Sequence, residues 1–242
     1  MPQSQPSQSA RPGNQLLDLL SEADLARLLQ RAERVTVPLR TLVTEAGEPS
    51  REVHFPLTSV FSSLIPLRDG STIEVATVGN EGMTGIDLLT DKPASVYRVI
   101  SQVEGESLRV PADFFRSLLL EAGPLARIIQ RYAMTVTHQC GQSAACNLRH
   151  DVEERMCRWL LMTHDRVRRD EFYLTQEFLG IMLGVRRQSV SLSASILQEA
   201  GLITYSRGNM KILDRPGLEA VSCECYATLR ETYRQVMGIT GG

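Results

Sequence analysis

Three polar side chains share one side of a predicted helix: Arg187, Gln188 and Ser191. An arginine can donate two hydrogen bonds to O6 and N7 of guanine, and a glutamine can pair with N6 and N7 of adenine. We therefore predict that these three residues contact base edges. A second set of polar residues surrounds them and is suited to hold backbone phosphates. This set contains Thr175, Gln176, Arg186, Ser189, Arg207 and Lys211.

Two short helices with a sharp turn between them are needed to present these side chains. Thr175 is a suitable N-cap for the first helix, and Gly184 supplies the conformational freedom of the turn. The apolar residues of the two helices would form one core: Phe178, Leu179, Met182, Leu183, Val185, Val190, Ile196 and Leu197. After Gly201, residues 202–213 predict a short hairpin, or wing, with a basic tip.

The charge pattern alone does not decide between a binding surface and an ordinary solvated face. An isolated basic pair such as Arg186-Arg187 is usually a solvated helix face. Here the glycine turn before the helix and the basic hairpin after it favour nucleic-acid binding. From residue 149 to the end, 13 Lys and Arg stand against 12 Asp and Glu, so binding would depend on the local placement of charge.

Residues 35–110 have the residue pattern of a small all-β domain. Short β-branched and aromatic runs are separated by Gly, Pro and Asp, which indicates a sandwich or a barrel. The expected strands are 34–38, 53–56, 60–67, 72–78, 96–103 and 108–110. Asp69-Gly70 predicts a tight hairpin turn. Leucines at helical spacing within residues 16–29, with Ser21 as an N-cap, predict two short helices before the strands.

A long amphipathic helix is predicted to begin at Gly123-Pro124. Its apolar stripe recurs at steps of three or four and consists of Leu125, Ile129, Tyr132, Val136, Cys140, Ala144 and Leu148. The stripe spans about 24 residues, or about 36 Å of helix. Because a small barrel would leave it exposed, we predict a homodimer with the first five of these residues at its interface. Packing against the chain's own barrel is the alternative. Residues 151–167 predict a second amphipathic helix.

Metal and thiol chemistry receive little support from the cysteine spacing. Five cysteines without a Cys-x-x-Cys pair indicate neither a disulfide framework nor a standard zinc site, so we expect reduced thiols and no metal or cofactor. One alternative is a metal, haem or thiol sensor that uses His138, Cys140, Cys146 and His150, although their spacing does not place all four on one helix face. Cys223-Glu-Cys225 is interpreted as part of an ordinary C-terminal helix.

Composition and hydropathy exclude other classes of protein. The chain of 242 residues has a formal net charge of −2 and no apolar run long enough to cross a bilayer. Residues 1–15 lack the features of a secretory signal, so we expect a cytoplasmic protein without a membrane partner. A metal-dependent barrel enzyme would need several inward ligands, and only His54 lies in the barrel segment, so no enzyme is predicted.

The chain resembles the Crp/Fnr superfamily of transcription regulators from about Leu16 to Tyr226. In the C-terminal part the matching residues are Leu174, Thr175, Gly180, Gly184, Arg187, Val190, Leu197, Gly201, Leu202 and Ile203. In the N-terminal part they are residues 53–62, the Asp69-Gly70 hairpin and residues 74–82. The resemblance implies an α+β fold with a cyclic-nucleotide-binding-like jelly-roll β-barrel, a long dimerisation helix and a C-terminal winged helix-turn-helix.

The same resemblance implies a homodimer whose two recognition helices enter successive major grooves of an inverted repeat in double-stranded DNA. RNA polymerase and a small-molecule effector are further partners to consider. Four parts follow: a disordered tail (1–15), a sensory β-barrel with flanking helices (16–123), a dimerisation helix (124–148) and a winged helix-turn-helix DNA-binding domain (149–242).

Departures from the family pattern narrow these expectations. The stretch 85–97 contains no arginine to hold a cyclic phosphate, so cyclic AMP is not expected as the effector. The first cysteine is Cys140, so the clustered N-terminal cysteines of the iron–sulfur members are missing. Well-known members have a glutamate at the position of Gln188, a glycine or serine at that of Ser191, and frequently an arginine at that of Leu192, which predicts a different DNA sequence here. The barrel either senses an effector that the sequence does not identify or serves only as a platform for dimerisation and polymerase contact.

Overall fold

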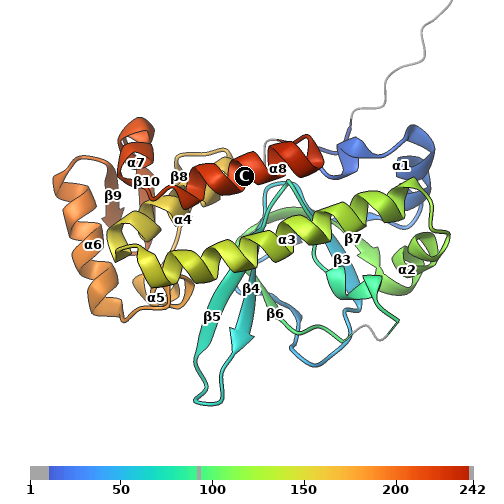
Figure 1. Ribbon diagram of the computed structural model, residues 1–242, viewed down its shortest axis with the longest axis horizontal. Helices are drawn as coiled ribbons and strands as arrows, with labels where there is room; N and C mark the ends of the chain where they lie inside the picture. The colour runs from blue at the N-terminus through green and yellow to red at the C-terminus, as the bar shows by residue number, and fades with distance from the viewer. Residues whose placement is uncertain (1–10, 92–93, 240–242) are drawn as a thin grey trace, which may run out of the picture.

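A computed structural model describes residues 11–91 and 94–239, and its N-terminal half contains two antiparallel β-sheets (Figure 1). The first sheet has the order β1-β7-β3, with β1 at Glu33–Val37, β7 at Gly105–Pro111 and β3 at Glu52–Pro56. The second has the order β2-β6-β4-β5, with β2 at Leu42–Thr44, β6 at Arg98–Val103, β4 at Val60–Pro66 and β5 at Thr72–Val78. The two sheets give the expected cyclic-nucleotide-binding-like fold, although they do not close into a complete barrel.

Two local features of the sheets differ from the sequence prediction. The three-residue strand β2 was not predicted, because it is short and follows Arg40, which has a positive φ of 63°. The β4–β5 hairpin is present, but a five-residue loop joins Pro66 to Thr72. Only Gly70 in that loop has a positive φ, of 84°, so the turn is wider than a two-residue hairpin.

The segment before the sheets is anchored to them, which shortens the predicted tail. Asn14 is fully buried, and its side-chain nitrogen donates to the backbone oxygens of Pro56 and Gly82, both at 2.9 Å. The rest of the predicted tail, residues 1–10, lies outside the described residues. A 3-10 helix (η1, Leu17–Leu19) and helix α1 (Glu22–Leu29) follow, and Ser21 caps α1 by accepting from the Asp24 amide as expected.

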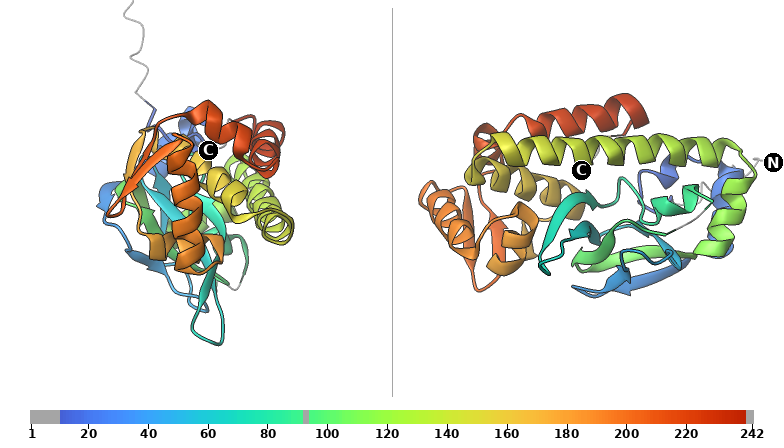
Figure 2. Two further views of the ribbon diagram at one scale, coloured as in Figure 1. Left: turned by 90° about the vertical axis from the view of Figure 1, so that its left-hand side faces the viewer. Right: turned by 60° about the horizontal axis from the view of Figure 1, so that its bottom comes forward.

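Helices α3 and α8 run side by side along the molecule, over the sheets (Figures 1 and 2). A second 3-10 helix (η2, Ile86–Leu89) lies between β5 and β6, and helix α2 (Ala112–Leu120) follows β7. Helix α3 spans Pro124–Arg149, close to the predicted bounds, and α8 spans Cys225–Met237. Helix α4, Val152–Val167, then begins with a capping box made by Asp151 and Glu154.

The apolar stripe of α3 does not form the predicted dimer interface. Leu125, Ile129, Tyr132 and Val136 are at most 4% exposed and belong to the hydrophobic core of the N-terminal half. The Tyr132 hydroxyl donates to the backbone oxygen of Met83 at 3.0 Å, and Cys140 is half-buried beside Tyr97. Burying each large apolar side chain contributes about 1.5 to 3 kcal/mol, and the chain's own β-domain supplies the partner surface. The alternative, packing against that domain, is therefore correct.

Another face of α3, which includes Leu148 from the end of the predicted stripe, is exposed along the whole length of the helix. We call this face the exposed seam, and it consists of Arg127, Arg131, Met134, His138, Gly141, Ala145 and Leu148. These residues alternate in steps of four and three, which is the heptad spacing of helices that pack along each other. Its two large apolar side chains, Met134 and Leu148, are 65% and 85% exposed.

The C-terminal half contains the helices and small sheet expected of a winged helix-turn-helix. Its elements are β8 (Glu171–Tyr173), α5 (Gln176–Leu183), α6 (Arg187–Glu199), β9 (Ile203–Ser206), β10 (Asn209–Ile212) and α7 (Arg215–Val221). The strand order is β8-β10-β9, and the short strand β8 was not predicted. Val60, Leu64 and Val103 of the β-sheets share the core of this half, so the two halves pack together.

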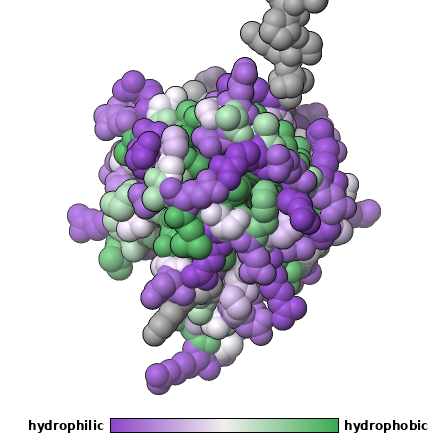
Figure 3. Space-filling model, turned by 90° about the vertical axis from the view of Figure 1, so that its right-hand side faces the viewer, coloured by the Kyte–Doolittle hydropathy of each residue, from purple (hydrophilic) through white to green (hydrophobic). Residues whose placement is uncertain are grey.

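The last helix packs against both halves of the chain. Helix α8 runs along α3, and its Tyr233 and Met237 join the core of the N-terminal half. Its Tyr226 and Leu229 join the core of the C-terminal half. The described residues after 149 therefore do not pack as one separate unit. Among the described residues, no helix is long and apolar enough to cross a membrane. The end of the molecule built by the N-terminal half is largely polar, with apolar groups in smaller areas between (Figure 3).

Candidate nucleic-acid interface

The turn between α5 and α6 depends on two glycines. Gly184 ends α5 with a φ of 63°, a conformation that L-residues other than glycine rarely adopt. At Gly180, a Cβ atom would lie 2.9 Å from the backbone oxygen of Val185, so a side chain there would force the helices apart. The Thr175 hydroxyl caps α5 by accepting from the Phe178 amide at 3.2 Å. The cap and the turn agree with the sequence prediction.

A groove of about 390 Å³ lies between the start of α5, the start of α6 and the tip of the wing. Its lining contains four of the nine predicted contact residues, together with an acidic residue and part of the wing: Thr175, Gln176, Arg187, Arg207, Glu177, Tyr205 and Gly208. Two arginines and three uncharged polar side chains line this concave surface, which makes it the best candidate for a phosphate backbone and base edges.

The predicted base-contacting residues are only partly brought together. Arg187 Nε and Ser191 Oγ both donate to Gln176 Oε1, at 3.3 and 3.0 Å, so these two side chains and Gln176 form one polar group. Gln188 is exposed at the start of α6 but does not line the groove. Ile196 was expected in the core of the helix pair, yet it is 44% exposed on the outer side of α6.

Three of the six predicted phosphate-contacting residues do not line the groove: Arg186, Ser189 and Lys211. Lys211 lines a neighbouring hollow of about 670 Å³ between the wing and the β-sheets, and its ammonium lies 2.6 Å from the Glu171 carboxylate. Arg207 lies at the wing tip, where it and Gly208 have positive φ angles of 50° and 87°. Arg186 is the exposed N-cap of α6 and makes no capping hydrogen bond with its side chain.

One small cavity lies in the β-domain, against its second sheet. This cavity of about 20 Å³ lies between the second sheet, η2 and α3, and its lining includes Thr84, Asp87, Tyr97 and Tyr132. That volume is close to the minimum for one water molecule, and ligand pockets are typically about 300 Å³ or larger. Among the described residues, no Arg, Lys or His lines this cavity.

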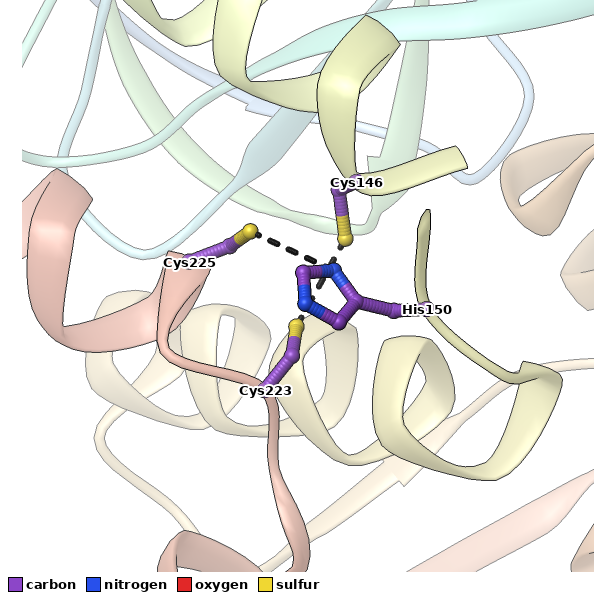
Figure 4. Close-up of side chains that lie close together, drawn as sticks. All are labelled: Cys146, His150, Cys223 and Cys225. Atoms are coloured by element: carbon purple, nitrogen blue, oxygen red, sulfur yellow. Dashed lines mark hydrogen bonds between the residues drawn. The ribbon is translucent and has the colours of Figure 1, made fainter. Parts of the chain in front are cut away.

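A cluster of three cysteines and one histidine lies at the junction of the two halves (Figure 4). Cys146 and His150 come from the end of α3, whereas Cys223 and Cys225 come from the start of α8 and the loop before it. Of the four residues in the sensor alternative, only Cys146 and His150 are here. His138 lies on the exposed seam, and Cys140 contacts Tyr97, so that set does not form one site.

Sequence reasoning missed this cluster because it treated the two segments separately. Cys146 and His150 are four residues apart, which places them on one face of a helix. Cys223 and Cys225 were assigned to an ordinary helix, but Cys223 precedes α8, so both thiols can point to the same side. The hydrogen bond from the Cys223 thiol lowers the pKa of Cys146, and the nearby Arg158 guanidinium lowers it further, although burial opposes both.

Comparison with known proteins supports the resemblance seen in the sequence. Residues 154–221 match the family model of a Crp-like helix-turn-helix domain. A Crp/Fnr-family transcriptional regulator from Eubacterium rectale has a TM-score of 0.66 at 16% identity, over 85% of this chain and 96% of that one. FixK2 from Bradyrhizobium japonicum has a TM-score of 0.65 at 18% identity, over 79% and 98%.

A third similar structure is the c-di-GMP responsive global regulator CLP of Xanthomonas campestris, with a TM-score of 0.62 at 15% identity, over 80% of this chain and 100% of that one. No curated protein matches the chain. The protein therefore carries a Crp-like helix-turn-helix domain, and its fold is that of Crp/Fnr transcription regulators.

Proposed function

We propose that this protein is a sequence-specific DNA-binding transcription regulator that acts as a homodimer on an inverted repeat. The observation that carries this proposal is the groove at the start of α6, where Thr175, Gln176, Arg187 and Arg207 line one concave surface of a Crp-like helix-turn-helix. Two such surfaces related by a two-fold axis would contact successive major grooves about 34 Å apart.

We further propose that cyclic AMP does not control this regulator and that the protein is not an enzyme. The small cavity between the second sheet, η2 and α3, with no cation in its lining, supports the first point. One similar structure is described as responsive to c-di-GMP, so this fold is not tied to cyclic AMP. His54 is the only histidine in the β-domain, which supports the second point. A regulator of this kind would work in the cytoplasm and contact RNA polymerase.

Selection of bound duplexes from a random DNA pool, at about 0.15 M salt, tests the proposal directly, because non-specific binding weakens as salt rises. The expected result is an inverted repeat with half-sites about ten base pairs apart, centre to centre. Enrichment of direct repeats or of single half-sites would contradict the homodimer. If the pool stays random for the dimeric protein at every salt concentration, sequence-specific recognition is wrong.

The variant Arg187→Ala should lose affinity for the selected site by about 1 to 3 kcal/mol, since it removes a bidentate contact with a base. It should also relax the sequence preference at one position of each half-site. Competition binding with sites mutated one base pair at a time would measure both effects. Equal affinity of the variant and the parent for all these sites would remove Arg187 from the base-contacting set.

The variant Arg207→Ala should weaken binding to specific and random DNA alike and reduce the slope of log affinity against log salt by about one. Lys211→Ala is the matched comparison, because Lys211 is paired with Glu171 and lies outside the groove. We expect it to change the salt slope less than Arg207→Ala does. A larger effect of the Lys211 variant would place the DNA backbone on the other side of the wing.

The homodimer would form through the exposed seam of α3, in place of the buried stripe. An added Cβ at Gly141 would meet no atom within 4 Å, so this part of the seam is open to close approach by a second helix. Residues 127–148 would give a contact about 32 Å long. Met134 and Leu148 are exposed in the single chain and have the heptad spacing of a two-helix contact.

The double variant Met134→Asp/Leu148→Asp should raise the dimer dissociation constant by about 100-fold or more, because a symmetric interface would bury each new charge twice. Sedimentation velocity over a concentration series would measure this. Leu120→Asp is the control, since Leu120 is equally exposed but lies on α2. If the double variant dimerises like the control, another surface forms the dimer.

A further inference from the structure

The four side chains at the junction of the two halves converge on one point. The possible ligand atoms of Cys146, His150, Cys223 and Cys225 all lie within 4.8 Å of one another. The three thiols are at most 4% exposed and form a cluster of their own, apart from the larger hydrophobic cores. Figure 4 shows the side chains pointing toward one another from the end of α3 and from the start of α8.

The distances within the cluster match the edges of a tetrahedron around a zinc ion. Zn–S bonds of about 2.3 Å and Zn–N bonds of about 2.0 Å imply S···S edges of about 3.8 Å and S···N edges of about 3.5 Å. The Cys146 and Cys223 sulfurs are 3.5 Å apart, and the Cys225 sulfur is 3.6 Å from His150 Nδ1. A small movement of side chains would therefore suffice to place a metal ion at the centre.

The groups around the cluster are those that surround metal ligands in proteins. A histidine that binds a metal through one ring nitrogen usually donates the other N–H to a carboxylate. His150 Nε2 lies 3.0 Å from the Glu224 carboxylate, which leaves Nδ1 facing the thiols. The Gln142 side-chain nitrogen donates to the Cys225 sulfur at 3.0 Å. The buried Arg158 guanidinium acts on Cys146 and would offset the negative charge of three thiolates and one zinc ion.

Two other uses of these thiols fit the geometry less well. A disulfide between Cys146 and Cys223 would use two of the four side chains and leave the arrangement of His150 and Cys225 unexplained. An iron–sulfur cluster holds its ligands around several metal atoms, whereas the four ligand atoms here lie close enough to surround a single ion.

We propose that Cys146, His150, Cys223 and Cys225 bind one zinc ion in a closed tetrahedral site. Four protein ligands leave no open position for a substrate, so the role of the ion is structural. It would join the end of α3 to the segment that begins α8. Because α4 starts two residues after His150, the ion would also fix the direction in which the chain passes from α3 into the DNA-binding half.

Metal analysis of the full-length chain, purified with a thiol reductant, tests this site. The expected result is about one zinc ion per chain in the wild type and less than about one tenth in Cys223→Ser. Cys140→Ser is the matched control, because this thiol lies on the same helix but outside the cluster, and it should keep its zinc. Zinc retained by Cys223→Ser, or lost from Cys140→Ser, would overturn the assignment.

Cobalt substitution keeps the test decisive if Cys223→Ser does not fold. Addition of Co²⁺ to the metal-free wild type should give thiolate-to-cobalt charge-transfer absorption and the intense visible bands of a tetrahedral site, saturating at about one equivalent. The His150→Ala variant keeps all three thiols and should lose the tetrahedral visible bands or require much more Co²⁺. No cobalt spectrum in the reduced wild type, or a Cys146–Cys223 disulfide in the protein as isolated without metal, would refute the zinc site.

Discussion

The variant Glu81→Ala should lower the free energy of unfolding by about 3 to 5 kcal/mol, because it would leave the guanidinium of Arg166 buried without a counter-charge. Both side chains of this ion pair are fully buried. Arg166 donates to Glu81 Oε1 from Nε at 3.0 Å and from Nη2 at 2.8 Å, and its Nη1 donates to the backbone oxygen of Met162 at 2.8 Å. The pair links the turn after β5 to α4, and hence the two halves of the chain.

Urea unfolding of the wild type and the variant would measure this loss. Glu121→Ala is the control, since Glu121 forms an ion pair with Arg27 in which both side chains are about half exposed. Such surface pairs contribute about 0 to 1 kcal/mol. A loss from Glu81→Ala no larger than that of the control would mean that water reaches Arg166. The double variant Glu81→Leu/Arg166→Met should recover part of the stability, because it removes both charges.

The two faces of α3 show that a sequence pattern does not predict which surface covers an apolar helix face. Both faces have helical spacing, and the more apolar one was predicted to pack against a second copy of the chain. Periodicity reveals that a face is buried, but it does not reveal which surface covers it. The structure uses Tyr132 and its neighbours to cover the chain's own β-domain. The less apolar seam with Met134, Gly141 and Leu148 is left to the solvent.

Local signals predicted the helix-turn-helix well because its geometry depends on neighbouring residues. The Thr175 cap and the positive φ of Gly184 act within one or two turns of helix, so the sequence pattern is sufficient. The cysteine cluster is the opposite case. Cys146 and Cys223 are 77 residues apart and meet only because α8 returns to lie along α3. Ion pairs such as Glu81 with Arg166 depend on tertiary packing in the same way.

A buried polar network between the two halves contains a carboxyl group with an unusual pKa. Burial raises the pKa of Glu74 on β5 to about 7, and the hydrogen bonds from Ser62 and Trp159 and the charges of Arg158 and Arg166 oppose this only in part. Ser62 Oγ is 2.6 Å from the Glu74 carboxyl and 2.7 Å from Gln102 Oε1. The Ser62 hydroxyl is the donor to the Glu74 carboxyl, so burial and not this hydrogen bond raises the pKa of Glu74.

The pKa of Glu74 differs between the folded and the unfolded chain, and this difference makes the free energy of unfolding depend on pH. In the unfolded chain Glu74 ionises near its ordinary pKa of 4.5, whereas the folded chain keeps the proton up to about pH 7. The protonated Glu74 side chain therefore stabilises the folded chain fully below pH 4.5. This stabilisation is lost as pH rises through 7, by about 3 kcal/mol in total. His54 acts in the opposite direction: burial and the charge of Arg109 lower its pKa to about 4, so its contribution is lost as pH falls.

The variant Glu74→Gln separates the pH dependence due to Glu74 from that due to His54, because a neutral amide can occupy the same position without titrating. Relative to the wild type, its free energy of unfolding should rise by about 3 kcal/mol between pH 4.5 and pH 7.5. Urea unfolding at a series of pH values would measure this difference, and the contribution of His54 cancels because it is common to both proteins. Parallel curves would mean that Glu74 is already ionised in the folded chain. Since Trp159 on α4 donates to the Glu74 carboxyl at 2.9 Å, ionisation near neutral pH would act on the contact between the β-domain and the DNA-binding half.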